Sequence, residues 1–436
     1  MDKLNILVLH RLGDPELAPL FLRHHVFALK TYFPEHNYIY HDTEMPLPGN
    51  IRDTQFDAII LDVTLLCVRW AGEEIYQRIR NEYAFVKDSS AVKLAFPQDE
   101  YDCNQILDDW MCEWGVDVVF SVISSNWDVL YPKYHLAGEV RLGYTGYIDE
   151  SLVRLPRIPF DDRAIDIGYR ARKLPPYFGR IGEVKCSIGR TVADRAREVG
   201  LTTDIVLGER ATLLGQAWLD FINNSKFTLG SNSGSSLLDP YGQIQRKVRD
   251  YLRENPSAQF DEVEEHCFKG LDSAHSFTAI SPRVLEAGLL ESCQILVEGE
   301  YSRVITPWEH YIPIRSDASD FEVVYEAMQD RSLVDRLRKN CRSALLDFDG
   351  LRASHNARKV IELIGALKTR KGVVSNFDVV AAVAKKYEEK MTTVLRGHWK
   401  HQAVKRKLSK IINKYPYAMR LAKSLRSVFG KRRLWK

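Results

Sequence analysis

The sequence predicts an α/β protein that consists of two successive parallel-sheet units and a basic helical tail. Its 436 residues exceed what one hydrophobic core usually serves, so two domains are expected. Short apolar runs alternate with helical patterns in both halves of the chain, which is typical of parallel sheets. The segment Leu155-Pro-Arg-Ile-Pro159 forms a stiff connection that suits neither a helix nor a central strand. We therefore expect units at residues 1–155 and 160–368, followed by a tail at 369–436.

The first unit carries six apolar runs that predict the strands of one sheet. These runs are short, and polar or turn residues separate them from helical patterns. The expected strands are residues 5–10, 37–41, 56–61, 92–96, 118–121 and 140–144, and the clearest helices are 17–32 and 73–86. No strand is followed by a GxGxxG turn, so a dinucleotide cofactor is not expected. The common hydrolase, metalloprotease and P-loop motifs are also missing from the sequence.

Polar residues follow two of these strands at the edge where ligands bind in parallel sheets. Gln98, Asp99 and Glu100 come directly after the strand at 92–96, and His10 ends the first strand. A carboxylate or imidazole at this edge can take a proton from a reacting hydroxyl group. Asp99, Glu100 and His10 are therefore the candidate catalytic residues, and a solvated loop is the alternative interpretation of the acidic cluster.

The second unit begins with a strand at residues 164–169 that leads directly into a basic segment. Arg170 and Arg172 follow the strand, and a glycine-containing loop with Lys185 precedes a helix that ends near Glu198. These cations are candidate ligands of a phosphate group, or they form an ordinary basic surface. Further strands are expected at 226–229, 294–297 and 311–314, and helices at 320–329, 332–346 and 354–367. Gly234 lies in a loop of small residues after the strand at 226–229, where a ligand could approach the backbone closely.

The segment that starts at Ser281 has the pattern of an anion-binding helix N-terminus. Ser281 is a good N-cap residue, Pro282 suits the first helical position, and Arg283 adds a positive charge. Glu286 lies one turn further along, where it can accept hydrogen bonds from sugar hydroxyl groups. The strand at 294–297 then opens a second loop at the same sheet edge. The candidate residues of that loop are Gly299, Glu300 and Tyr301.

This helix, strand and loop resemble the donor-binding half of GT-B glycosyltransferases, particularly the retaining family 4 enzymes. Glu286-Ala287 matches the second of two family glutamates, whereas Thr278 stands at the position of the first. The resemblance implies that Lys185 and either Arg170 or Arg172 neutralise the diphosphate of the donor. An insertion at about 237–277 separates the small-residue loop from the Ser281 helix and is absent from the usual family chain.

The function that the resemblance implies is sugar transfer from a nucleotide sugar to a glycan or lipid-linked acceptor. It implies two Rossmann-like domains facing a cleft, retention at the anomeric carbon and no metal cofactor. The expected role is cell-surface polysaccharide or glycoconjugate synthesis. A binding or scaffold protein that keeps the fold without turnover is the alternative, because Thr278 replaces a family glutamate. Asp347-Phe-Asp349 fits a metal-binding DxD pattern, but its position at the end of a helical segment indicates a helix stop and turn.

Positive charge is concentrated at the end of the chain. Residues 391–436 contain fourteen Lys and Arg and no Asp or Glu, which leaves 47 basic against 58 acidic residues elsewhere. Residues 418–435 combine an apolar helical face with basic residues, so the tail is expected to bind an anionic membrane surface. A soluble helix packed on the acidic body is the alternative. Nucleic acid is not expected as a partner because the acidic body repels it.

The sequence also indicates a cellular location. The first ten residues form a strand pattern rather than a signal peptide, and the seven cysteines form no CxxC pair. We therefore expect a cytoplasmic protein on the inner face of the cell membrane.

Overall fold

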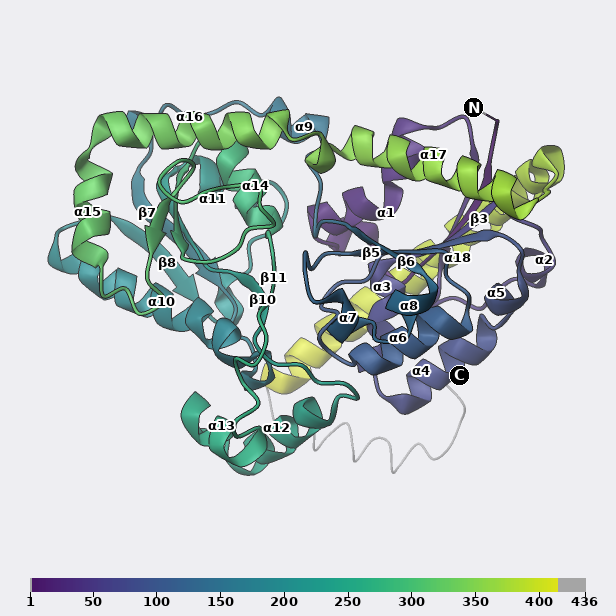
Figure 1. The fold of residues 1–436 in the computed structure, drawn as a ribbon, viewed down its shortest axis with the longest axis horizontal. Coiled ribbons are helices and arrows are strands. Elements are labelled where there is room, and N and C mark those ends of the chain that lie inside the picture. Colours follow the sequence, from purple (N-terminus) through teal and green to yellow (C-terminus); the bar gives the residue numbers. More distant parts are fainter. Residues whose placement is uncertain (1, 415–436) are drawn as a thin grey trace. The chain divides into compact units, whose positions relative to one another are not determined.

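The computed structural model describes residues 2–414. The chain divides into two compact units, of which the larger extends to Val380 and the smaller begins at Ala381. Two separate parallel sheets, each with its own set of helices, lie in the larger unit (Figure 1). This arrangement confirms the predicted α/β fold class with two Rossmann-like sheets.

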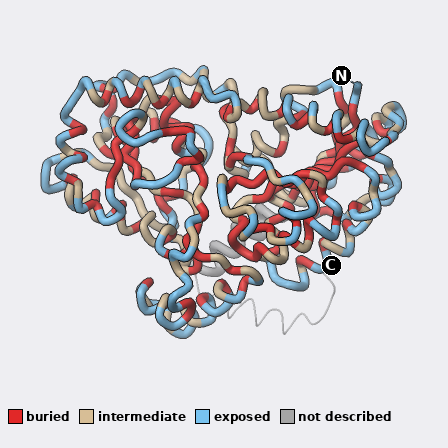
Figure 2. Tube along the Cα trace, viewed as in Figure 1, coloured by how far each residue is buried: buried red, intermediate tan, exposed pale blue. Residues whose placement is uncertain are grey.

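The first sheet has six parallel strands in the order β2-β1-β3-β4-β5-β6. The strands are β1 Asn5–His10, β2 Asn37–Asp42, β3 Ala58–Leu61, β4 Val92–Ala95, β5 Val118–Ser121 and β6 Glu139–Leu142. The central strands are buried along their whole length, as expected where both faces of a sheet are covered (Figure 2). The edge strand β6 is largely exposed. All six strands predicted for this half are therefore confirmed.

Short helices connect the strands of the first sheet. They are α1 Leu20–Tyr32, α2 Gly49–Arg52, α3 Val63–Leu66, α4 Glu73–Glu82, α5 Phe85–Asp88, α6 Asn104–Glu113, α7 Trp127–Leu130, α8 Tyr134–Ala137 and α9 Glu150–Val153. The single helix expected at 73–86 is thus two helices. The break falls at Tyr83, whose buried hydroxyl group hydrogen-bonds Nε2 of His41 at 2.7 Å.

The second sheet has five parallel strands in the order β13-β12-β9-β7-β8. The strands are β7 Ile165–Ala171, β8 Thr203–Leu207, β9 Ser225–Gly230, β12 Cys293–Val297 and β13 Ile312–Ile314. Four of them were predicted. The edge strand β8 was missed because it is short, begins with two polar residues and is only half-buried.

A two-stranded ribbon replaces the small-residue loop expected after β9. Its strands are β10 Ser233–Ser235 and β11 Phe277–Ala279, which pair in antiparallel orientation. The insertion between them contains α12 Gln243–Glu254 and α13 Phe260–Cys267. These two helices share a small core of their own with Tyr177. The insertion is therefore a subdomain carried at the end of the ribbon.

The remaining helices cover the second sheet and then return to the first. They are α10 Gly179–Glu198, α11 Gln216–Asn223, α14 Pro282–Leu289, α15 Phe321–Gln329, α16 Arg331–Asp347 and α17 Ala353–Lys371. Ala357, Val360 and Ile364 of α17 pack into the core of the first sheet. α16 ends at Asp347 and a single 3-10 turn begins at Asp349, which confirms the helix stop predicted there.

The last helix, α18 Phe377–Lys414, forms most of the smaller unit. No helix in the described part of the chain is long and apolar enough to span a membrane. The amphipathic segment predicted at 418–435 lies outside the described residues.

Candidate functional site

Three loops of the second sheet meet at the carboxyl ends of β9 and β12. The amide of Ile280, just before α14, donates to Oγ of Ser302 in the loop after β12 at 3.0 Å. Nδ2 of Asn232, in the loop after β9, donates to the carbonyl oxygen of Glu300 at 3.4 Å. The sheet edge predicted to hold the ligand is thus formed by residues 230–235, 280–283 and 298–302.

Helix α14 begins where the sequence predicts. Oγ of Ser281 accepts from the amide of Arg283 at 3.2 Å, and Pro282 occupies the first helical position. The cap uses one of the free amides, and the positive end of the helix dipole still faces this edge. The side chain of Arg283 is exposed, and its guanidinium donates to the carbonyl oxygen of Arg170 at the end of β7.

Lys185 supplies a second cation beside Arg283. Its pKa is lowered to about 8, first because it is desolvated and then because the charge of Arg283 repels it, while Asp99 acts in the opposite direction. Among the residues that the structure describes, the ammonium group has no hydrogen-bond or ion-pair partner. Two cations thus lie close together, and among the described residues no carboxylate of the second half is paired with either.

Glu286 is buried one turn into α14. Its Oε2 accepts from the indole Nε1 of Trp218 at 2.6 Å, and burial raises its pKa to about 7. Trp218 lies on α11, and its ring is 5.3 Å from the guanidinium carbon of Arg283. Trp218 was not predicted from the sequence, because a tryptophan on an amphipathic helix carries no signal of a polar role.

The structure separates the two arginines that the sequence left as alternatives. Arg170 is buried and donates to Oδ2 and the carbonyl oxygen of Asp204, both at 2.6 Å, with its guanidinium 4.0 Å from the ring of Phe221. Arg172 is exposed. Since the donors of Arg170 are engaged inside the protein, Arg172 is the arginine that remains open to a ligand.

The glycines before Lys185 and Gly234 have structural roles that differ from those predicted from the sequence. The glycines before Lys185 lie inside α10, so Lys185 projects from the second turn of a helix and not from a glycine loop. Gly234 has a φ of 141°, and a Cβ atom there would lie 1.8 Å from the carbonyl oxygen of Phe277. The pairing of β10 with β11 therefore explains this glycine, and no ligand is needed to account for it.

The loop after β12 contributes less than the sequence suggested. Gly299 has a φ of 155°, and a Cβ atom there would lie 2.5 Å from Nδ2 of Asn232. Tyr301 is buried, and its hydroxyl group donates to the carbonyl oxygen of Val297 at 2.7 Å. Glu300 is exposed, so it is the one side chain of these three that faces solvent.

At the edge of the first sheet, Asp99 is the accessible carboxylate. It is half-buried with a φ of 49°, and it accepts from the hydroxyl group of Tyr101 at 2.6 Å. The buried Arg69, which sequence reasoning missed, holds this turn by donating to the carbonyl oxygens of Gln98 at 2.9 Å and Asp99 at 2.8 Å. The strained turn is therefore fixed by a buried cation.

The other two candidate catalytic residues point into the protein. Glu100 is fully buried, accepts from the hydroxyl group of Tyr131 at 3.2 Å, and has its pKa raised to about 7 by desolvation. His10 is buried, and its Nδ1 accepts from the amide of Leu12 at 3.3 Å. Burial lowers the pKa of His10. Neither side chain reaches solvent as Asp99 does.

Direct contacts join the two sheet edges. Oγ1 of Thr145 donates to the carbonyl oxygen of Ile280 at 2.5 Å, and Nε2 of Gln98 donates to the carbonyl oxygen of Thr145 at 3.3 Å. Beside them, Pro282 and Glu286 line a cavity of only about 10 Å³ together with His24. A sugar ring has no room there, so a ligand of Glu286 would enter only if the two edges separated.

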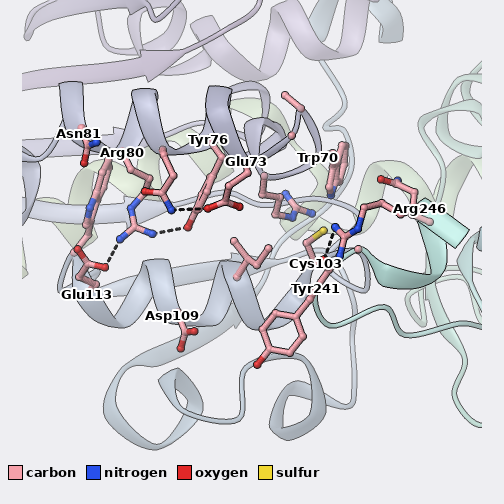
Figure 3. A pocket seen from close by; sticks show the side chains of 18 of the residues that line it. Trp70, Glu73, Tyr76, Arg80, Asn81, Cys103, Asp109, Glu113, Tyr241 and Arg246 are labelled. Carbon is pink, nitrogen blue, oxygen red and sulfur yellow. Dashed lines mark hydrogen bonds and ion pairs between the residues drawn. The ribbon is translucent and has the colours of Figure 1, made fainter. Parts of the chain in front are cut away.

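A much larger hollow of about 1020 Å³ lies between α4, α6 and α12 (Figure 3). None of the candidate residues from the sequence lines it. Size alone therefore does not identify the predicted site, which is defined by its charges and loop geometry.

The comparisons with known proteins gave similar folds only among solved structures. No family model matches the chain, and no curated protein matches it. HepE of Anabaena in complex with UDP and glucose covers 83% of this chain and all of its own, with a TM-score of 0.47 and 9% identity. A glycosyltransferase of Rickettsia africae covers 84% of this chain and 99% of its own, with a TM-score of 0.34 and 8% identity.

A third similar structure is an alpha-glucosyltransferase in complex with UDP and a DNA containing an HMU base. It covers 83% of this chain and 99% of its own, with a TM-score of 0.47 and 13% identity. What these proteins bind is a property of those proteins, because the likeness lies in the backbone alone.

Proposed function

We propose that this chain is a glycosyltransferase that moves a sugar from a nucleotide-sugar donor to a glycan or lipid-linked acceptor. The observation that carries the proposal is the convergence of Lys185 and Arg283 at the start of α14. Two unpaired cations beside a helix N-terminus are costly to hold together unless an anion joins them. A diphosphate has the charge and the size to do so.

In the proposed reaction the bond between the sugar and the diphosphate breaks, and negative charge develops on the leaving phosphate. Lys185, Arg283 and the dipole of α14 stabilise that charge in a fixed arrangement, which is the main source of catalysis at such sites. Because these groups already supply positive charge, we propose transfer that does not depend on a metal. Glu286 would accept hydrogen bonds from the ribose of the donor.

The acceptor would approach from the first sheet, where Asp99 is the accessible carboxylate. Asp99 also acts electrostatically on Lys185, which supports assigning both residues to the proposed site. Asp99 would take the proton of the acceptor hydroxyl group as the new bond to the sugar forms. Retention at the anomeric carbon, and a role in polysaccharide synthesis, rest on the resemblance to family 4 enzymes. The basic tail is proposed to hold the protein on an anionic membrane.

Thr278 favours a second candidate, a protein that binds nucleotide sugars without turnover. This residue lies on β11 opposite Gly234, at the position where the resembled family has a glutamate. To separate the candidates, the full chain is incubated with UDP-, GDP-, ADP- and dTDP-linked sugars and free nucleotide is measured. Release that Lys185→Ala abolishes supports the enzyme. Binding without release supports the second candidate, and neither binding nor release contradicts both.

A further inference from the structure

The large hollow between α4, α6 and α12 is lined by one face from each of three helices. On α4 the lining residues follow helical spacing and are Glu73, Tyr76, Gln77, Arg80 and Asn81. Asp109 and Glu113 of α6 and Arg246 of α12 lie on the other walls (Figure 3). Arg249 of α12 also lines the hollow. At ten residues α4 is about 15 Å long, so the hollow is a groove that suits an extended ligand.

The lining of this groove is polar, with aromatic rings among the polar groups. Trp70 is half-buried near one end, and Tyr241 is 48% exposed at the entrance of the insertion. Amides and carboxylates stand between them, as with Gln77, whose Nε2 donates to Oε1 of Glu73 at 2.8 Å. Flat rings combined with hydrogen-bonding side chains fit sugar rings, which present both apolar faces and hydroxyl groups. An apolar protein partner would find little surface here to bury.

The unpaired charges on the α12 wall of the groove are positive, whereas Glu73 on α4 is an acidic lining residue with no ion pair among the described residues. Glu113 pairs with Arg80, and Asp109 pairs with Lys133. On α12, Arg246 donates only to the carbonyl oxygen of Tyr241, at 3.0 Å, and no carboxylate in the described part of the chain pairs with it.

Arg249 is the other arginine of α12 that lines the groove. It forms no ion pair within the described residues, and its guanidinium carbon lies 5.7 Å from the ring of Tyr177. Asp102, which interacts with it electrostatically, is buried, and desolvation raises the pKa of Asp102 to about 8. At neutral pH this carboxyl group is largely protonated and does not neutralise the arginine. Two exposed arginines on one helix face, neither paired with a carboxylate among the described residues, are therefore available to a negatively charged group.

We propose that the groove binds an acidic glycan chain, with sugar rings against Trp70 and Tyr241 and an anionic substituent at Arg246 and Arg249. Three of these four groups, Tyr241, Arg246 and Arg249, belong to the insertion, whose helix α12 forms the third wall of the groove. The glycan's role as acceptor or growing product rests on the function proposed above, whereas its binding does not.

Hydrogen exchange measured by mass spectrometry on the full chain tests the site, because it localises binding and separates the groove from the basic tail. The probes are oligogalacturonate, a maltooligosaccharide of equal length and an oligothymidylate of similar charge. We expect oligogalacturonate to protect segments 70–84 and 241–254 more strongly than the other two. No protection by oligogalacturonate would overturn the proposal. Equal protection by oligothymidylate or by the neutral glycan would contradict an acidic-glycan site.

Variants measured by calorimetry in the same protein complete the test. Arg246→Ala with Arg249→Ala is expected to weaken oligogalacturonate binding at least about tenfold, since charge-assisted hydrogen bonds are lost. Tyr241→Ala is expected to weaken it several-fold. The matched control is Arg253→Ala on the same helix, an exposed residue that pairs with Asp250 and does not line the groove. Equal affinity for all variants contradicts the proposal.

The nucleotide-release assay reports on the proposed function separately. Glycan protection without nucleotide release leaves the groove intact as a binding site and contradicts the enzyme. Nucleotide release without glycan protection supports the enzyme and contradicts the glycan site in the groove.

Discussion

The indole N–H of Trp218 donates to the buried carboxylate of Glu286 at 2.6 Å, and the same ring lies beside the guanidinium of Arg283. One aromatic side chain therefore contacts both the proposed acceptor for sugar hydroxyl groups and the proposed phosphate-binding cation. This contact couples α11 to the N-terminal end of α14.

Replacing Glu286 is expected to weaken use of the nucleotide sugar strongly. Glu286→Ala removes one charge-assisted contact, which is typically worth about 1.5–3 kcal/mol, or roughly ten- to a hundredfold in kcat/KM. Trp218→Phe, which keeps the ring and loses the donor, is expected to have a smaller effect in the same direction. Wild-type kinetics in a folded Glu286→Ala variant would show that Glu286 does not contribute to use of the donor.

Replacing Lys185 is expected to reduce affinity for the leaving nucleoside diphosphate by a similar roughly ten- to hundredfold factor. Lys185→Arg keeps the charge and should retain much of the affinity. The control is Arg190→Ala on the same helix, an exposed residue in a surface pair with Glu183. Calorimetric titration measures the affinity of each variant for the nucleoside diphosphate. An equal loss of affinity in Arg190→Ala would contradict a specific role of Lys185.

Substitution of Arg170 and substitution of Arg172, the two arginines at the end of β7, should have different effects on stability and on kinetics. Arg170→Ala breaks a partly buried pair with Asp204, so it is expected to cost about 1–3 kcal/mol of unfolding free energy. Arg172→Ala is expected to leave stability unchanged and to raise KM for the donor. Denaturant unfolding and steady-state kinetics on both variants check this assignment, which the reverse pattern would contradict.

The affinity for the diphosphate is expected to depend on pH above neutrality. Lys185 has a pKa lowered to about 8, so its positive charge is lost as the pH rises through that value. Binding should therefore weaken above about pH 8. In Lys185→Arg the guanidinium stays charged and the decline should disappear. A decline of equal size in both proteins would assign it to another group.

If the chain turns over as proposed, chelation of divalent metal is expected to leave activity largely intact, because Lys185 and Arg283 would supply the positive charge at the diphosphate. The measurement is nucleotide release before and after treatment with a chelator. Loss of activity that added metal restores would contradict metal independence. It would favour a metal site at Asp347 and Asp349, which are exposed where α16 ends.

The sequence predicted the sheets well because buried parallel strands such as β1 and β12 are continuous apolar runs with clear turns around them. It also located the start of α14, since Ser281 and Pro282 are local signals. It could not choose between Arg170 and Arg172, because the choice depends on Asp204 in a strand that has no clear pattern. Trp218 and Arg69 were missed for a related reason, as their partners lie far away in the sequence.

Gly234 also shows that the sequence does not reveal a contact with a residue far away in the chain. A glycine in a run of small residues predicts that another group approaches the backbone closely, and the structure shows such a close approach at Gly234. The approaching group is the carbonyl oxygen of Phe277, more than forty positions later in the chain, and only the paired ribbon reveals it.

The central claim is that Lys185 and Arg283 together form the diphosphate site. The most direct test is calorimetric titration of nucleoside diphosphates into the wild-type protein, the two single Ala variants and the double variant. We expect binding by the wild type, weakening in each single variant and no measurable binding in the double variant, whose fold is checked by thermal unfolding. Unchanged binding in a folded double variant would contradict the account.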